Sequence, residues 1–124
     1  MSTWGLYPWF RESGLELIHP DDRSLVETYS PYCRVCEAIG RDGPYFVLRY
    51  DEHQFRGKPE LFQPISPPIF VLGQTVRTRE PRTIREGVVR SIVWHYQIQE
   101  PLYFLTVSGK RLSAQFRADE LESV

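Results

Sequence analysis

Two cysteines, Cys33 and Cys36, have the C-x-x-C spacing found in zinc sites and thiol redox centres, and the 124-residue chain has no others. A zinc site would need a second pair of soft ligands, which the sequence lacks. A redox pair would need a helix N-terminus to stabilise its thiolate. Here the pair opens a β-prone segment, which places the two side chains on opposite faces. We therefore interpret both cysteines as structural.

The other candidates for acid–base or metal chemistry are three separated histidines and one pair of acids. His19, His53 and His95 show no spacing typical of a metal site. Asp21 and Asp22 follow a proline at the expected start of a helix, where the helix dipole alone favours acids. Glycine-rich phosphate loops and nucleophile elbows are absent from the sequence. We therefore predict no catalytic residue, no metal and no cofactor, and a protein that is not an enzyme.

Basic and aromatic side chains in the second half are the most suggestive binding residues. Five arginines against two glutamates give residues 76–90 a net charge of +3. Rings beside arginines suit stacking on a ligand and contact with acidic groups. The predicted partner-binding residues are Arg77, Arg79, Arg82, Trp94, Tyr96 and Tyr103.

Three interpretations of these arginines remain open. They bind nucleic acid, they bind an acidic protein surface, or they are solvated or paired within the chain. Residues 1–66 hold 7 basic and 10 acidic side chains and residues 67–124 hold 8 and 6, giving net charges of −3 and +2. Pairing between the two halves would therefore satisfy the arginines. The total charge of −1 gives no general attraction to nucleic acid or to an anionic membrane.

A second aromatic group lies near the N-terminus and consists of Trp4, Tyr7, Trp9 and Phe10. A terminal aromatic segment of this kind commonly packs across its own domain, and we favour that interpretation. An exposed cluster would instead contact a partner or a second copy of the chain, because large exposed apolar patches are uncommon on monomers. The sequence leaves a monomer and a homodimer open.

The candidate residues described above are expected to lie on one short helix and several short strands. The proline and acids near residue 20 predict a short helix at about 21–29, which Ser30-Pro31 ends. From Tyr32 onward the hydrophobic pattern has a period of two, which indicates β structure. The β-prone segments lie at residues 45–50, 54–56, 73–77, 87–94, 102–107 and 111–116.

A proline-rich linker divides the chain. Three prolines within residues 63–68 make this segment semi-rigid. We predict two domains, residues 1–66 and 67–124. A weak internal repeat also relates the halves. It aligns Tyr45-Phe46-Val47-Leu48, Phe55-Arg56 and Glu60-Leu61 with Tyr103-Phe104-Leu105-Thr106, Phe116-Arg117 and Glu120-Leu121.

Residues 70–124 contain a strand entered through Gly73, a basic loop, the strand Gly87-Val88-Val89-Arg90, a hairpin and a terminal helical turn. This order resembles small SH3-like barrels, including those built on KOW-type motifs. The resemblance implies a five-stranded barrel, which would remove most exposed strand edges. We therefore predict a mostly β fold of two SH3-like barrel units in tandem. In the second unit we expect Phe104 in the core, so that Phe104→Asp unfolds it.

The first half carries Gly5-Leu6-Tyr7-Pro8-Trp9-Phe10, Leu17-Ile18-His19-Pro20-Asp21-Asp22 and Lys58-Pro59-Glu60-Leu61-Phe62. This combination resembles an uncharacterised family of small bacterial proteins. The resemblance implies no activity and no catalytic residues.

Abundant aromatics without recognisable chemistry favour a non-enzymatic interaction module that binds a protein or peptide through aromatic grooves. The alternative is a nucleic-acid or ribosome-associated protein that uses the basic segment Arg77–Arg90. An apolar segment long enough to span a bilayer is absent, as is a signal peptide at the start. Together with only 2 cysteines, this pattern predicts a cytoplasmic protein without a membrane partner.

Overall fold

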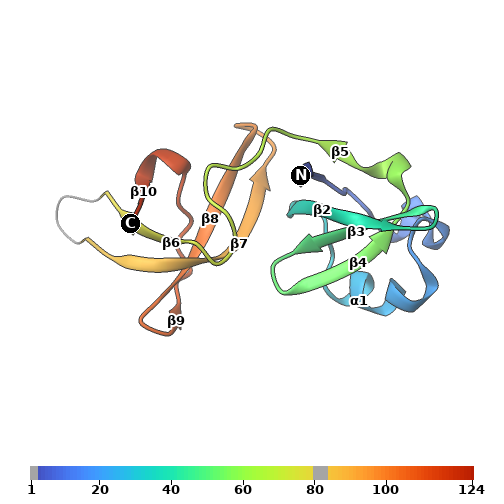
Figure 1. Cartoon of the computed structure of the whole chain (residues 1–124), viewed down its shortest axis with the longest axis horizontal. Helices are drawn as coiled ribbons and strands as arrows, with labels where there is room; N and C mark the ends of the chain where they lie inside the picture. The colour runs from blue at the N-terminus through green and yellow to red at the C-terminus, as the bar shows by residue number, and fades with distance from the viewer. Residues whose placement is uncertain (1–2, 80–83) are drawn as a thin grey trace. The chain divides into compact units, whose positions relative to one another are not determined.

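The computed structural model describes residues 3–79 and 84–124. The chain divides into two compact units, which we call the first unit (residues 1–67) and the second unit (68–124) (Figure 1). Each contains one five-stranded antiparallel sheet, which confirms the prediction of a mostly β protein. Within the described residues the only α-helix is α1 (Arg23–Thr28), which confirms the short N-terminal helix. No helix in the described part of the chain is long and apolar enough to cross a membrane.

The first unit places its five strands in the order β4-β3-β2-β1-β5. Short 3-10 turns flank the helix and precede the last strand. The strands are β1 (Thr3–Leu6), β2 (Val35–Asp42), β3 (Tyr45–Tyr50), β4 (His53–Gly57) and β5 (Gln63–Pro64). The 3-10 turns are Arg11–Ser13, Leu15–Leu17, Pro20–Asp22 and Pro59–Leu61.

The second unit is built from strands alone, apart from one 3-10 turn at Ala118–Glu120 in its described part. Its strand order is β10-β6-β7-β8-β9. The strands are β6 (Thr75–Thr78), β7 (Glu86–His95), β8 (Glu100–Val107), β9 (Lys110–Arg111) and β10 (Leu121–Ser123). The longest pairing is the β7–β8 hairpin, whose register joins Ile92 to Tyr103.

Both units follow one strand plan. If the strands of each unit are counted along the chain, both sheets have the order fourth, third, second, first, fifth. The second strand of each unit is irregular, between Ala38 and Gly40 in β2 and between Val89 and Ser91 in β7. A 3-10 turn precedes the last strand in both units. This shared plan supports the internal repeat seen in the sequence.

Neither sheet closes into a barrel within the described residues, so the prediction of barrel units is corrected to two open sheets. The short edge strands β5 and β9 have two residues each, and Pro64 has no N–H to donate. In the first unit, a preceding segment covers the edge of β4 instead. The N–H of His19 donates to the carbonyl of Arg56 at 2.9 Å, and the N–H of Lys58 donates to the carbonyl of Leu17 at 2.8 Å.

Aromatic rings form much of the core of the first unit. Tyr7 is 0% exposed, and its ring meets Phe55 edge-on at 5.4 Å between centroids. Its hydroxyl donates to the carbonyl of Lys58 at 2.9 Å, which gives the buried polar group a partner. Tyr50 also packs edge-on against Phe55, with ring centroids 5.7 Å apart. The helix contributes Val26 to the same cluster.

The second unit buries Tyr103 and Leu105 of β8, together with Phe116, which is bridged to Tyr103. Phe104 is half-buried and lies beneath the guanidinium of Arg90, 5.0 Å from its carbon. The expectation that Phe104 lies in the core is therefore wrong. Residues 102–105 are all apolar, so the sequence shows no alternation of apolar and polar residues there. The pattern therefore could not show which face of β8 is buried.

Candidate functional site

The N-terminal aromatic group is divided between the interior and the surface. Trp4, Tyr7 and Trp9 are buried, whereas Phe10 is 48% exposed. The indole N–H of Trp9 donates to the carbonyl of Gly14 at 2.9 Å. Three of the four rings therefore stabilise the fold, and Phe10 alone is presented to solvent.

Phe10 forms a ring pair with Tyr32, which is 37% exposed and lies in the turn between α1 and β2. The ring centroids are 4.4 Å apart at an interplanar angle of 39°. The 3-10 turn Arg11–Ser13 holds Phe10 in place, because the N–H of Ser13 donates to the Phe10 carbonyl at 2.9 Å. The N–H of Phe10 also donates to Oγ of Ser13 at 3.3 Å. This pair is therefore positioned by local hydrogen bonds.

A second ring pair joins Tyr29, at the end of α1, to His53 of β4. The rings are stacked with centroids 4.3 Å apart and an interplanar angle of 21°. Tyr29 is 53% exposed, yet its carbonyl accepts a hydrogen bond from the hydroxyl of buried Tyr50. The backbone that carries this exposed ring is thus bonded to a core residue.

We call Phe10, Tyr29, Tyr32 and His53 the aromatic surface. Tyr29 and Tyr32 are three residues apart, so their Cα atoms lie within about 11 Å of each other. An ion pair of 3.9 Å between Arg11 and Glu27 links the 3-10 turn to α1 next to both ring pairs. Sequence analysis missed this surface, because its rings come from three separate segments and only Phe10 belonged to a recognisable aromatic cluster.

The aromatic residues predicted to bind a partner in the second unit are not brought together at the surface. Tyr103 is 0% exposed, and its hydroxyl accepts a hydrogen bond from the N–H of Ile69 at 3.1 Å. Burial raises the pKa of this hydroxyl. Trp94, at the end of β7, and Tyr96, in the following turn, are both half-buried. Tyr103 therefore belongs to the interior, apart from any surface that Trp94 and Tyr96 form.

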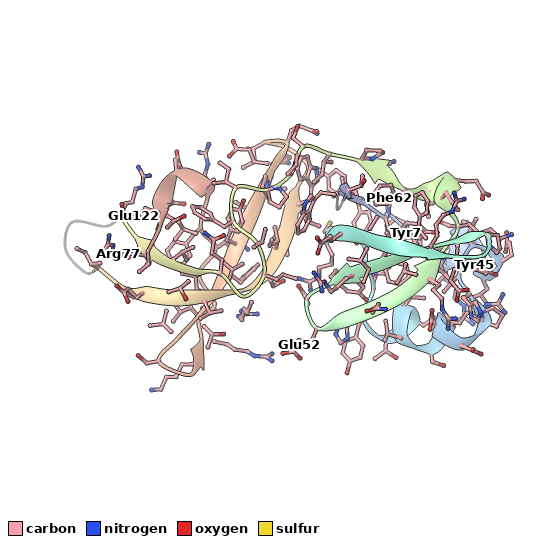
Figure 2. The ribbon with its side chains drawn as sticks, viewed as in Figure 1. Tyr7, Tyr45, Glu52, Phe62, Arg77 and Glu122 are labelled. Carbon is pink, nitrogen blue, oxygen red and sulfur yellow. The ribbon has the colours of Figure 1, made fainter. Side chains whose placement is uncertain are left out.

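The predicted arginines are bonded within the second unit. Nε of Arg77 lies 3.3 Å from Oε1 of Glu122, and Figure 2 shows the two side chains side by side. Nε of Arg79 donates to the carbonyl of Leu121 at 3.0 Å. Both partners lie in the second unit, whereas one of the open interpretations placed the partners in the acidic first half. Arg82 lies outside the described residues.

Neither cysteine is activated. Cys36 is completely buried, which raises the pKa of its thiol to about 12. Burial also raises the pKa of the Cys33 thiol, despite the opposing charge of Arg34. Both shifts disfavour the nucleophilic thiolate. The described residues contain no group of three His, Cys, Asp or Glu side chains that could hold a metal ion.

A charged cluster at the edge of β4 gives the Asp21-Asp22 pair a structural role that the helix dipole does not explain. Asp22 accepts hydrogen bonds from the backbone N–H of Arg56 at 2.8 Å and from its Nε at 2.9 Å. Nη1 of Arg56 also donates to Asp42 at 3.0 Å, whereas Asp21 lies 3.8 Å from Nη2. Asp22 therefore satisfies an edge N–H of the sheet that no strand pairs.

The same cluster borders a pocket of about 310 Å³ lined by Asp22, Asp42, Val47, Gln54, Phe55 and Arg56. Its two carboxylates are both bonded to Arg56. Burial by itself raises the pKa of Asp22, but the hydrogen bonds and charge of Arg56 outweigh it and hold the pKa below its ordinary value of 3.8. Asp22 is therefore poorly suited to donate a proton near neutral pH.

This low pKa predicts a specific loss of stability in acid. Because the folded pKa lies below the unfolded one, the contribution of Asp22 is present above about pH 4 and is lost as the pH falls through the folded value. We expect Asp22→Asn to lower the melting temperature by several degrees near pH 7. This difference should shrink as the pH falls below about 4 and through the folded pKa of Asp22. Asp119→Asn, in an exposed turn of the second unit, serves as the control. A deficit in Asp22→Asn that does not change with pH would contradict the assignment.

The structure thus defines a small protein of two open β units that share one strand plan, with exposed aromatic rings on the first. The chain belongs to the family of unknown function DUF6960, whose model matches residues 1–122. The match spans both units, whereas the resemblance seen in the sequence covered the first half alone. No curated protein and no solved structure matches the chain, so the SH3-like resemblance of the second half has no relative to support it.

Proposed function

We propose that this protein is a non-enzymatic interaction module whose aromatic surface binds a segment of a protein partner. The observation that carries the proposal is a set of two ring contacts, Phe10 with Tyr32 and Tyr29 with half-buried His53, in which the other three rings are exposed. Rings have few rotatable bonds and offer a large contact area, so binding through them costs little conformational entropy. Peptide-binding modules use aromatic-lined surfaces in this way.

Preorganisation supports the proposal further. The carbonyl of Tyr29 is bonded to buried Tyr50, and Phe10 is bonded to the 3-10 turn that follows it. A surface held in its binding geometry before the partner arrives loses less free energy on association than a flexible one. The backbone that carries the rings of Phe10 and Tyr29 is therefore fixed by hydrogen bonds before any partner binds.

The proposal also includes an SH3-like fold for each of the two units. The strand order that both units share, with a 3-10 turn before the last strand, supports an SH3-like plan in an open form. The nucleic-acid alternative has weaker support. Arg77 and Arg79 are bonded within the second unit, and Arg90 donates to the carbonyl of Leu112 at 2.9 Å.

Selection of random dodecapeptides on the immobilised full chain tests the proposal. We expect selected peptides to perturb the amide resonances of Phe10, Tyr29, Tyr32 and His53 in the ¹⁵N-labelled protein. The double variant Phe10→Ala and Tyr29→Ala should weaken their binding by at least about tenfold, as expected when interface anchors are truncated.

The matched control removes two exposed aliphatic side chains of the second unit, Val88→Ala and Ile98→Ala, each 41% exposed before the change. We expect this control to retain wild-type affinity. Selected peptides that map elsewhere, or that lose affinity equally in the control and in the aromatic variant, would refute the proposed surface.

A further inference from the structure

We infer that the aromatic surface recognises cationic side chains, arginine above all, in the partner segment; this inference rests on the function proposed above. The occupant is thus a basic peptide segment, identified by the charges that border the rings and by the chemistry of the rings themselves.

In each ring pair, one ring has an exposed carboxylate within two residues of it in the chain. Glu12 is exposed in the 3-10 turn Arg11–Ser13, two residues after Phe10. Glu52 is exposed at the turn between β3 and β4, immediately before His53, where Figure 2 labels it. Within residues 3–79 and 84–124, neither carboxylate forms an ion pair. Both are therefore available to a cation on a partner.

The arginines closest to the rings in sequence, Arg11 and Arg34, do not cancel this negative charge. Arg11 lies 3.9 Å from Glu27, and Arg34 lies 3.9 Å from Asp51, so each is matched by its own carboxylate. With these pairs balanced, the exposed carboxylates Glu12 and Glu52 add negative charge next to Phe10 and His53 in the chain. Charge complementarity therefore favours a basic partner over an acidic one.

The rings themselves favour the same partner. The face of an aromatic ring carries partial negative charge and attracts a cation within about 6 Å of its centre, and the planar guanidinium of arginine also stacks on it. This chain already uses the interaction internally: the guanidinium carbon of Arg41 lies 5.5 Å from the Phe46 ring centre, and that of Arg90 lies 5.0 Å from Phe104. Phe10 and Tyr29 present comparable rings to solvent.

Titration of the ¹⁵N-labelled full chain with an acetylated Arg-Gly repeat peptide tests the inference. We expect saturable shifts at the four residues of the aromatic surface and affinity that falls as salt is raised, because salt screens exposed charges. A Glu-Gly repeat and decaproline should not bind. The double variant Glu12→Lys and Glu52→Lys should weaken binding of the Arg-Gly peptide by about tenfold.

The control variant Glu60→Lys and Glu86→Lys makes the same change in net charge at exposed positions in the 3-10 turn Pro59–Leu61 and in β7, neither of which carries a ring of the aromatic surface. It should retain most of the affinity. Equal losses in the two charge variants would overturn the inference, because they would show only a response to net charge. Binding of decaproline in preference to the Arg-Gly peptide would also overturn it.

Two results separate this inference from the proposed function. If selected dodecapeptides bind the aromatic surface but the Arg-Gly peptide does not, the protein-binding function stands and the cationic specificity is wrong. If sedimentation shows a dimer that Phe10→Ala dissociates, the occupant is a second copy of this chain, which also overturns the assignment of a basic peptide.

Discussion

Replacing Tyr103 with alanine is expected to lower the free energy of unfolding of the second unit by about 3–5 kcal/mol, the usual cost of truncating a buried aromatic ring. The ring is 0% exposed and meets Phe70 edge-on, with centroids 5.3 Å apart. Removal of the ring would leave a cavity, and the N–H of Ile69 would lose its acceptor. Chemical denaturation of the full chain, followed by circular dichroism and by tryptophan fluorescence, measures the effect.

Tyr103→Phe is the matched control, because it keeps the ring and removes only the hydroxyl. We expect it to cost about 1–2 kcal/mol through the lost hydrogen bond. If Tyr103→Ala were no less stable than wild type, the ring could not lie in the core as described. The prediction also affects binding experiments: a variant that lacks Tyr103 would report on unfolding rather than on a partner surface.

Gly57→Ala is expected to destabilise the first unit by about 2–3 kcal/mol through overpacking. A Cβ atom at Gly57 would lie 2.6 Å from the hydroxyl oxygen of Tyr7 and 2.7 Å from its Cζ. Tyr7 cannot move away easily, because it is fully buried and its hydroxyl is bonded to the carbonyl of Lys58. Figure 2 labels Tyr7 among the side chains of this unit. Thermal unfolding followed by circular dichroism measures the loss.

Gly40→Ala provides the control, since a Cβ atom there would meet nothing within 4 Å. Its backbone is not in the left-handed region, so alanine introduces no strain of that kind. We expect its stability to change by less than about 1 kcal/mol. Equal losses in the two glycine variants would mean that strand flexibility, and not contact with Tyr7, explains the effect.

The Asp22–Arg56 contact shows why the pairing of charges was not predictable. The two residues are 34 positions apart, and the local sequence gave Asp22 a sufficient role at the start of a helix. Its actual partner depends on how the segment before α1 lies along β4. Tyr29 and His53 are related in the same way, since their stacking requires the end of the helix to meet the start of a distant strand.

The pattern of the chain by itself determined the mostly β composition and the short helix near residue 23, because propensity and period are local properties. The unreactive character of the Cys33–Cys36 pair was also argued from local context. Only the tertiary structure decided that the sheets stay open, that Tyr103 rather than Phe104 faces the core, and which rings reach solvent. These outcomes depend on contacts between segments far apart in the sequence, where an uninterrupted apolar run such as 102–105 fits either face equally well.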